Sequence, residues 1–565
     1  MNQAFVQAMQ AGYTLAEPAL VVGSPMLQGE VVPTVRVQQA LAMTNRHGLI
    51  AGATGTGKTK TLQILAGELS QAGVPIFISD VKGDVTGIAA GGNAADARLQ
   101  ERCRTLAWDY HPAGHPVEFL SLSGRLGAQV RATVHSFGPL LLAKVLDLND
   151  TQTAVLTLVF RYCDDQQLPL LDLADLRTTL QYLGSDEGKA ALAAYGGMST
   201  PTLGVLLRSL IVLEESGAGS FFGEPEFDVR DLLRLTPDGQ GVVSVLELSD
   251  VMDKPRLFST FMLWLLAQLY ASLPEMGDLP KPKLAFFFDE AHLLFHDASK
   301  ALLEQIELTV RLIRSKGVGV FFATQTPSDV PSTVLAQLGN RFQHALRAFT
   351  PEDADDLRKT ARTFPTSTFY DIEEVITSLG IGEALVTVLS PRGIPTPVAA
   401  TMLIPPDSLM AALDPTDFQD RLASGSLRGK YGTAIDRQSA HEIILGRLQA
   451  ARAAAQQAAA QQAGAQQAAA QAAGATGSRP YDQPPTVSWE ARQRQVIYEE
   501  GRRAERDRQA AEKARRAQEK ERQAAERARL KTIDTTVRTA GRVMTSRAGQ
   551  DIVRTVFGTL FGSKD

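Results

Sequence analysis

The chain has 565 residues, 44% of them hydrophobic, which allows two to four domains with a large core, while a net charge of −5 gives no global nucleic-acid signature. Its two cysteines, Cys103 and Cys163, are too far apart for a zinc motif and fit a reduced, cytoplasmic compartment. The start lacks a secretory signal, and the most apolar long stretch, residues 258–273, is too short for a membrane span and is expected as a buried helix.

The first motif in chain order is a glycine-rich segment, residues 52–59. It follows an apolar run at residues 48–51 and precedes a helical pattern, the context of a phosphate-binding loop. The backbone N–H groups and the helix N-terminus favour a triphosphate, Lys58 reaches its β- and γ-phosphates, and the Thr59 hydroxyl binds Mg²⁺. The residues expected to bind ATP are Gly52, Ala53, Thr54, Gly55, Thr56, Gly57, Lys58, Thr59 and Lys60.

Further apolar runs predict the rest of the fold. Helical patterns separate several of them, which indicates an α/β fold with a mainly parallel sheet. Leucines at helical spacing over residues 130–235 predict an α-helical insertion or, alternatively, a separate substrate domain. Thr350 and Pro351 suit a helix start. The expected strands are residues 76–79, 242–248, 284–288, 318–323, 345–349 and 384–389.

Two of these strands end in candidate catalytic residues. The strand at residues 284–288 runs into Asp289 and Glu290, as in a Walker B motif. Asp289 is expected to hold Mg²⁺ opposite Thr59, and Glu290 to polarise the attacking water. Gln325, at the tip of the next strand, is either a contact of the γ-phosphate or a simple turn residue. Together with the glycine loop, this pattern predicts hydrolysis as well as binding.

A cationic segment precedes the strand at residues 318–323. Arg311, Arg314 and Lys316 fall in the last turn of a predicted helix, where they complement the helix dipole. The alternative is that one of them reaches the nucleotide of a neighbouring subunit as an arginine finger.

Several longer stretches carry a resemblance to a known family. The chain resembles the HerA–FtsK branch of P-loop motors, and within it the HerA-like bacterial family labelled a domain of unknown function. The resemblance covers roughly residues 20–410 and, weakly, the last thirty residues. The matching stretches are residues 45–51, 79–84, 137–142, 148–152, 286–295, 310–320 and 338–349.

The resemblance implies a RecA-like ATPase that assembles as a hexameric ring with active sites shared between neighbours. Arg314 matches the position of the trans-acting arginine in the FtsK motors, and Arg341 and Arg347 are weaker alternatives. HerA itself carries an N-terminal β-barrel. The first 45 residues here suffice for a strand or two but not for a barrel.

Composition predicts the remaining boundaries. The segments are a short N-terminal strand segment (residues 1–45), the ATPase core (46–405) with its insertion (130–235), an extension of the core (406–448), an Ala/Gln-rich linker (449–485), a charged helix (486–530) and an amphipathic segment (531–565). The charged helix is either a solvated helix or an arm that binds DNA or a partner. The last segment is expected to dock on the ring, self-associate or bind a protein partner.

Three functions remain open from the sequence. The first is a hexameric DNA translocase or helicase driven by ATP and Mg²⁺, with DNA resting on family analogy. The second is a motor or switch directed at protein, like related secretion and conjugation ATPases. The third is an interaction scaffold whose oligomeric state ATP regulates.

Overall fold

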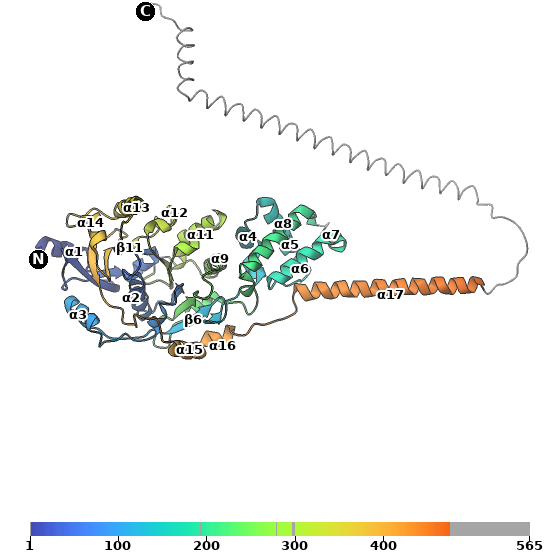
Figure 1. Cartoon of the computed structure of the whole chain (residues 1–565), viewed down its shortest axis with the longest axis horizontal. Coiled ribbons are helices and arrows are strands. Elements are labelled where there is room, and N and C mark those ends of the chain that lie inside the picture. The colour runs from blue at the N-terminus through green and yellow to red at the C-terminus, as the bar shows by residue number, and fades with distance from the viewer. Residues whose placement is uncertain (1, 193–194, 278, 296–299, 475–565) are drawn as a thin grey trace, which may run out of the picture. The chain divides into compact units, whose positions relative to one another are not determined.

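A computed structural model describes residues 2–192, 195–277, 279–295 and 300–474 (Figure 1). One compact unit spans Met1–Ala458. Over the described residues, thirteen strands form a single sheet. The predicted charged helix and amphipathic segment lie outside the described residues.

The sheet has a parallel part that runs in the order β11-β4-β10-β9-β5-β8-β6-β7. The glycine-loop strand β4 therefore lies between β10 and β11, and the Walker B strand β9 lies between β10 and β5. The bounds are β4 (Gly48–Ala51), β5 (Ile76–Asp80), β6 (Val117–Ser121), β7 (Ala128–Gln129), β8 (Val243–Glu247), β9 (Leu284–Phe288), β10 (Val318–Thr324) and β11 (Asn340–Gln343).

The remaining strands are antiparallel and extend the sheet from β11 through β12, β13 and β1. Their bounds are β1 (Ala19–Leu27), β2 (Glu30–Val31), β3 (Val37–Ala40), β12 (Glu383–Thr387) and β13 (Ala399–Leu403). The prediction of a mainly parallel α/β sheet is confirmed, because every pair from β11 to β7 is parallel.

Helices cover both faces of the parallel part. Side chains alternate along each strand, so Phe286 and Phe288 join one buried cluster, with Trp264, while Phe287 joins the opposite one, with Leu65. The main helices flanking the sheet are α2 (Lys58–Gln71), α3 (Ala97–Leu106), α9 (Pro255–Ser272), α10 (His292–Phe295), α11 (Lys300–Ile313) and α12 (Ser332–Leu335). The buried helix predicted at residues 258–273 is thus α9.

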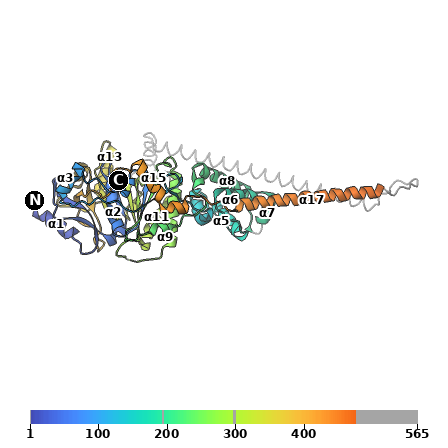
Figure 2. The ribbon, with the colours of Figure 1, turned by 90° about the horizontal axis from the view of Figure 1, so that it is seen from below.

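The leucine-rich interval forms the predicted helices. They share one buried cluster with the sheet, in which Phe137 and Leu180 join Phe286, and they gather on one side of the unit in both views (Figures 1 and 2). The helices are α4 (Val134–Val145), α5 (Asp150–Asp165), α6 (Leu173–Gly184), α7 (Asp186–Leu192) and α8 (Thr200–Glu215). The insertion lies in the same compact unit as the sheet.

The strand predicted at residues 345–349 is wrong. The strand in this region is β11, which ends at Gln343 opposite Ala51, the last residue of β4. Beyond Gln343 the chain leaves the sheet, and the carbonyl of Ala345 accepts the Ala53 N–H of the glycine loop at 2.9 Å. Ala345 and Leu346 are buried, whereas the chain from Arg347 to Phe349 is exposed, so the run lacks the continuous burial of a central strand.

The N-terminal segment holds more structure than a strand or two. Besides β1, β2 and β3 it forms α1 (Gln3–Tyr13), which the sequence analysis did not predict. Asn2 caps this helix by accepting the N–H groups of Ala4 and Phe5. Phe5, Met9 and Tyr13 form its buried face.

The remaining helices of the described chain follow β11 in sequence. Thr350 caps α13 with Pro351 in its first turn, as predicted. The Ala/Gln-rich stretch continues one helix that begins earlier, and its side chains are exposed from residue 451 to 468. No helix among the described residues is long and apolar enough to cross a membrane. The helices are α13 (Pro351–Ala361), α14 (Ile372–Ser378), α15 (Pro415–Ser424), α16 (Ser426–Tyr431) and α17 (Ala440–Gly474).

Candidate nucleotide-binding site

The glycine loop joins β4 to α2 at the carboxyl edge of the parallel strands. Gly52, Gly55 and Gly57 have φ values of 154°, 77° and 112°, which a residue with a side chain rarely adopts. Gly57 caps α2 in the left-handed region, so that the free N–H groups of the first helical turn face the loop. The loop therefore has the backbone conformation that a phosphate cradle requires.

Lys58 lies across this cradle. Its ammonium donates to the carbonyl oxygens of Gly52 at 2.8 Å and Ala53 at 3.2 Å. Burial lowers the pKa of Lys58, and the nearby carboxylates of Glu290 and Asp289 oppose that shift. The amine thus lies between the loop and the acidic strand ends, where it would contact a terminal phosphate.

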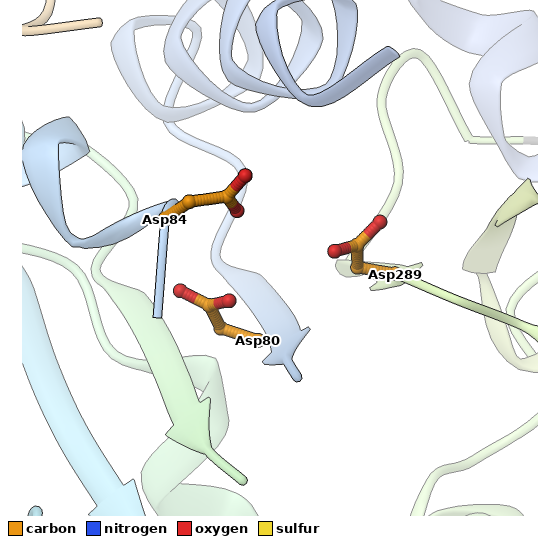
Figure 3. A group of neighbouring side chains, drawn as sticks. All are labelled: Asp80, Asp84 and Asp289. Atoms are coloured by element: carbon orange, nitrogen blue, oxygen red, sulfur yellow. The ribbon is translucent and has the colours of Figure 1, made fainter. Parts of the chain in front are cut away.

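Three carboxylates converge next to the loop and form an acidic cluster, Asp80, Asp84 and Asp289 (Figure 3). Asp80 ends β5, Asp84 lies on the following loop, and Asp289 follows β9. One oxygen from each carboxylate lies within 4.8 Å of the others. The Thr59 hydroxyl donates to Asp84 Oδ2 at 3.4 Å, which links the cluster to the glycine loop.

The acidic cluster has the donor set of a divalent-cation site. Burial raises the pKa of Asp289 to about 7, and the neighbouring Glu290 and Asp80 add to the shift. Burial also raises the pKa of Asp80 to about 6. Asp84 Oδ1 is buried without a hydrogen-bond partner among the described residues. Buried, crowded oxygens of this kind suit Mg²⁺, a hard cation that prefers oxygen ligands.

Glu290 is held in place by Lys82. The Lys82 ammonium forms an ion pair with Glu290 Oε1, and His292 Nδ1 lies 3.4 Å from Oε2. The ion pair raises the pKa of Lys82. Glu290 is 4% exposed and its φ of 47° falls in the left-handed region, which is uncommon for a residue other than glycine. Lys82 lies on the loop that Asp80 orders by accepting the backbone N–H groups of Lys82, Gly83 and Val85.

Gln325 follows β10 directly, and β10 lies between the glycine-loop strand and the Walker B strand. The Gly52 N–H lies 3.2 Å from the carbonyl oxygens of both Thr324 and Gln325. The Gln325 side chain is exposed at the edge of the sheet that carries the loop. Its position is therefore next to the phosphate cradle.

The three candidate arginines lie in different environments. Arg314 is exposed on a 3₁₀ turn, Arg314–Lys316, before β10 begins. The strand β10 separates it from its own glycine loop by roughly 20 Å at about 3.3 Å per residue. Arg341 donates to the carbonyls of Leu335, Leu338 and Thr363.

Arg347 has a comparable set of contacts within its own chain. It donates to the carbonyl oxygens of Thr377 and Leu379. The guanidinium groups of both alternatives are thus occupied by contacts inside the subunit, whereas the Arg314 side chain is exposed.

Sequence reasoning missed part of the site. It assigned no role to Asp80, Lys82 or Asp84, although residues 79–84 were among the stretches that carried the family resemblance. The sequence pattern that could have indicated these three residues is a polar run directly after the buried strand β5, which pairs in parallel with β9. Because parallel strands end at the same edge, that run had to meet Asp289.

The strand order and the glycine loop define a RecA-like P-loop fold. The chain belongs to the helicase HerA-like C-terminal family, whose model matches residues 26–565. No curated protein matches the chain.

Several solved structures are similar to the chain at low identity. The plasmid coupling protein TrwB in complex with ADP and Mg²⁺ is 14% identical, with a TM-score of 0.46, covering 77% of this chain and 94% of that one. TrwB with a non-hydrolysable ATP analogue is 15% identical, with a TM-score of 0.46 and coverage of 71% and 98%. VirB4 of Thermoanaerobacter pseudethanolicus is 16% identical, with a TM-score of 0.42 and coverage of 69% and 98%.

Proposed function

We propose that the protein hydrolyses ATP with Mg²⁺ and works as a ring motor of the HerA–FtsK type, acting as a DNA translocase or helicase. The observation that carries the proposal is the meeting of a complete phosphate loop, the acidic cluster and Glu290 at one edge of adjacent parallel strands. A phosphate cradle, a cation site and a base for water are the parts that phosphoryl transfer to water requires.

Each residue has a separate task in this proposal. The loop N–H groups and Lys58 would bind the phosphates, and Thr59, Asp84 and Asp289 would hold Mg²⁺. The metal supplies charge neutralisation on the phosphate oxygens. Glu290 accepts a proton from the attacking water, and Gln325 orients that water.

Lys82 controls when Glu290 can act. In the ion pair, the Glu290 carboxylate is engaged by an ammonium and cannot orient water at the same time. Lys82 and Asp84 share the loop that follows β5, so the residue that pairs with Glu290 and a carboxylate that would hold Mg²⁺ lie on one segment. Separation of Lys82 from Glu290 would free the carboxylate to accept a proton from water.

Arg314 completes the site of a neighbouring subunit. Its distance from its own glycine loop excludes a role in its own site, and its exposure leaves it available to another subunit. This arrangement requires an oligomer, for which we propose the hexameric ring of the family.

The choice of DNA as the polymer rests on the family alone. The net charge of −5 favours no nucleic acid, which keeps a protein-directed motor as the second candidate. An ATP-regulated interaction scaffold is the third. DNA stimulation of the ATPase separates the first candidate from the other two.

Two substitutions test the ATPase. Lys58→Ala should abolish ATP binding, whereas Glu290→Gln should bind ATP and lose turnover, since the two residues act at different steps. Lys189→Ala and Glu101→Gln, both at exposed side chains, are the matched controls. Equal loss of ATP binding in both site variants, with folding intact, contradicts the assignment of Glu290 as the base.

A further inference from the structure

A buried histidine, His344, packs against the glycine loop. It follows β11 directly, and its side chain is fully buried. Its backbone N–H donates to the carbonyl oxygen of Ala51 at 2.7 Å, so the chain at His344 is still bound to the strand that leads into the loop. The position of the imidazole ring is therefore set by the sheet.

The histidine fills the space next to two glycines of the loop. A Cβ on Gly52 would clash with the Cβ of His344, and a Cβ on Gly57 would lie 3.6 Å from its Cε1. Because a side chain at residue 52 would overlap the histidine, the close approach of the loop to β11 requires glycine there. His344 thus contacts the loop near both of its ends.

Hydrogen bonds connect the ring to the first turns of α2. His344 Nε2 lies 2.8 Å from the Thr61 hydroxyl oxygen, and that oxygen lies 3.4 Å from the carbonyl oxygen of Gly57. A hydroxyl has one proton to donate, and a carbonyl can only accept. When Thr61 donates to Gly57, Nε2 must carry the proton of the imidazole and donate to Thr61. The donors then run from His344 through Thr61 to the loop.

The ring is neutral in this position. Burial lowers the pKa of His344 to about 4, against the opposing effect of the Glu383 backbone, and the charge of Lys58 adds to the lowering. A neutral imidazole carries one N–H, which the contact with Thr61 uses. Near neutral pH the side chain is therefore a hydrogen-bond donor that does not titrate.

The two glycines that His344 contacts determine the shape of the phosphate cradle. Gly57 precedes Lys58 and caps α2 in the left-handed region, and the carbonyl of Gly52 accepts the Lys58 ammonium at 2.8 Å. A shift of either glycine would turn the loop N–H groups or the ammonium away from the phosphates. A group that fixes both glycines therefore acts on phosphate binding without touching a phosphate.

We propose that His344 is a positioning residue of the phosphate loop, which it holds in the binding conformation through Thr61 and the carbonyl of Gly57. The proposal rests on the proposed function, because it assumes that the loop binds the triphosphate of ATP. It deepens that function by adding a residue that acts on affinity through the loop backbone.

The test measures dissociation constants for ATP and for inorganic tripolyphosphate by calorimetry. His344→Phe keeps a ring but no donor, and Thr61→Val removes the hydroxyl from a side chain of similar shape. Each should bind both ligands about fivefold more weakly, because one hydrogen bond is lost. His344→Gln, whose amide can donate in place of Nε2, should bind within about twofold of the wild type. His115→Phe, at a buried histidine packed on Gly67 further along α2, is the control and should bind as the wild type does.

Two further readouts separate positioning from a general loss of stability. The double variant of His344→Phe and Thr61→Val should bind no more weakly than either single variant, since both changes break the same chain of hydrogen bonds. The KM for ATP should rise in the single variants, while kcat stays within about twofold of the wild type, since Glu290 and the acidic cluster are unchanged.

The outcomes distinguish the two proposals. Wild-type protein that binds neither ATP nor tripolyphosphate overturns the proposed function. If the wild type binds both, unchanged affinity in folded His344→Phe, an equal loss in His344→Gln, or additive losses in the double variant overturns the role of His344. Thr61→Val decides the matter if His344→Phe does not fold, because unchanged affinity in that variant also overturns the proposal.

Discussion

Replacing Asp289 by asparagine should stabilise the metal-free protein while removing its response to Mg²⁺. Burial raises the pKa of this carboxyl from 3.8 to about 7, so the ionised form is costly in the folded state. The folded protein binds the proton more tightly than the unfolded chain does. The resulting loss of stability begins as the pH rises above 3.8 and is complete above about 7.

The size of the stability difference follows from the pKa shift of Asp289. About three pKa units correspond to roughly 4 kcal/mol at pH 8, and at pH 5 only about 2 kcal/mol has been lost. Asp289→Asn carries no charge and avoids this loss, so its advantage over the wild type grows between pH 5 and pH 8. Mg²⁺ offsets the same charge in the wild type, and the variant offers it one ligand fewer.

Thermal unfolding of both proteins, at pH 5 and pH 8, with EDTA or with Mg²⁺, measures this. The variant should melt above the wild type in EDTA at pH 8, and Mg²⁺ should raise the melting temperature of the wild type much more than that of the variant. Asp109→Asn, whose side chain is 91% exposed, is the control and should match the wild type. A variant that is less stable than the wild type in EDTA at pH 8, or that keeps the full Mg²⁺ response, refutes the reasoning.

Three further predictions concern release, assembly and the tail. Lys82→Met should raise basal ATP turnover several-fold and Lys82→Arg should not, because Met frees Glu290 from its ion pair; a fall in turnover with unchanged ATP affinity contradicts this. Arg314→Ala should bind ATP yet lose about 10³-fold or more in turnover, and mixing it with Glu290→Gln subunits should restore part of it; no recovery despite proven subunit exchange excludes a role in trans. Truncation after Ala458, where the compact unit ends, should keep ATP binding and basal turnover and alter assembly by light scattering; loss of ATP binding places the tail in the core.

Local patterns were sufficient for the central part of the site. The glycine loop and the strand ending in Asp289 are each a local sequence pattern. The apolar run before the loop, the helix start after it and the apolar residues of the strand can be recognised without tertiary information. The same holds for α13, whose cap and proline occupy consecutive positions. These elements were predicted from the sequence and appear where expected.

The rest of the site depends on which strands are neighbours. Asp84 approaches Thr59, and Lys82 approaches Glu290, only because β5 lies beside β9. No pattern within residues 79–84 indicates that β5 pairs with β9.

The two errors have local causes. The run at residues 345–349 is not a strand: β4 ends at Ala51, opposite Gln343, and the chain from Arg347 to Phe349 is exposed. Helix α1 was missed although its signals were present in Asn2 as a cap and in the four-residue spacing of Phe5, Met9 and Tyr13. In the first case a run of apolar residues was taken for a strand, and in the second the start of helix α1 was overlooked.

The most direct test of the central claim, an ATP-driven motor that acts on DNA, is the ATPase rate with and without duplex and single-stranded DNA across a salt series. We expect turnover that depends on Mg²⁺, is absent in Glu290→Gln, and is stimulated by DNA with an effect that declines as salt rises, since phosphate contacts release counterions. ATP turnover that no DNA changes at any salt concentration contradicts the DNA motor, and absence of turnover in the wild type contradicts the ATPase itself.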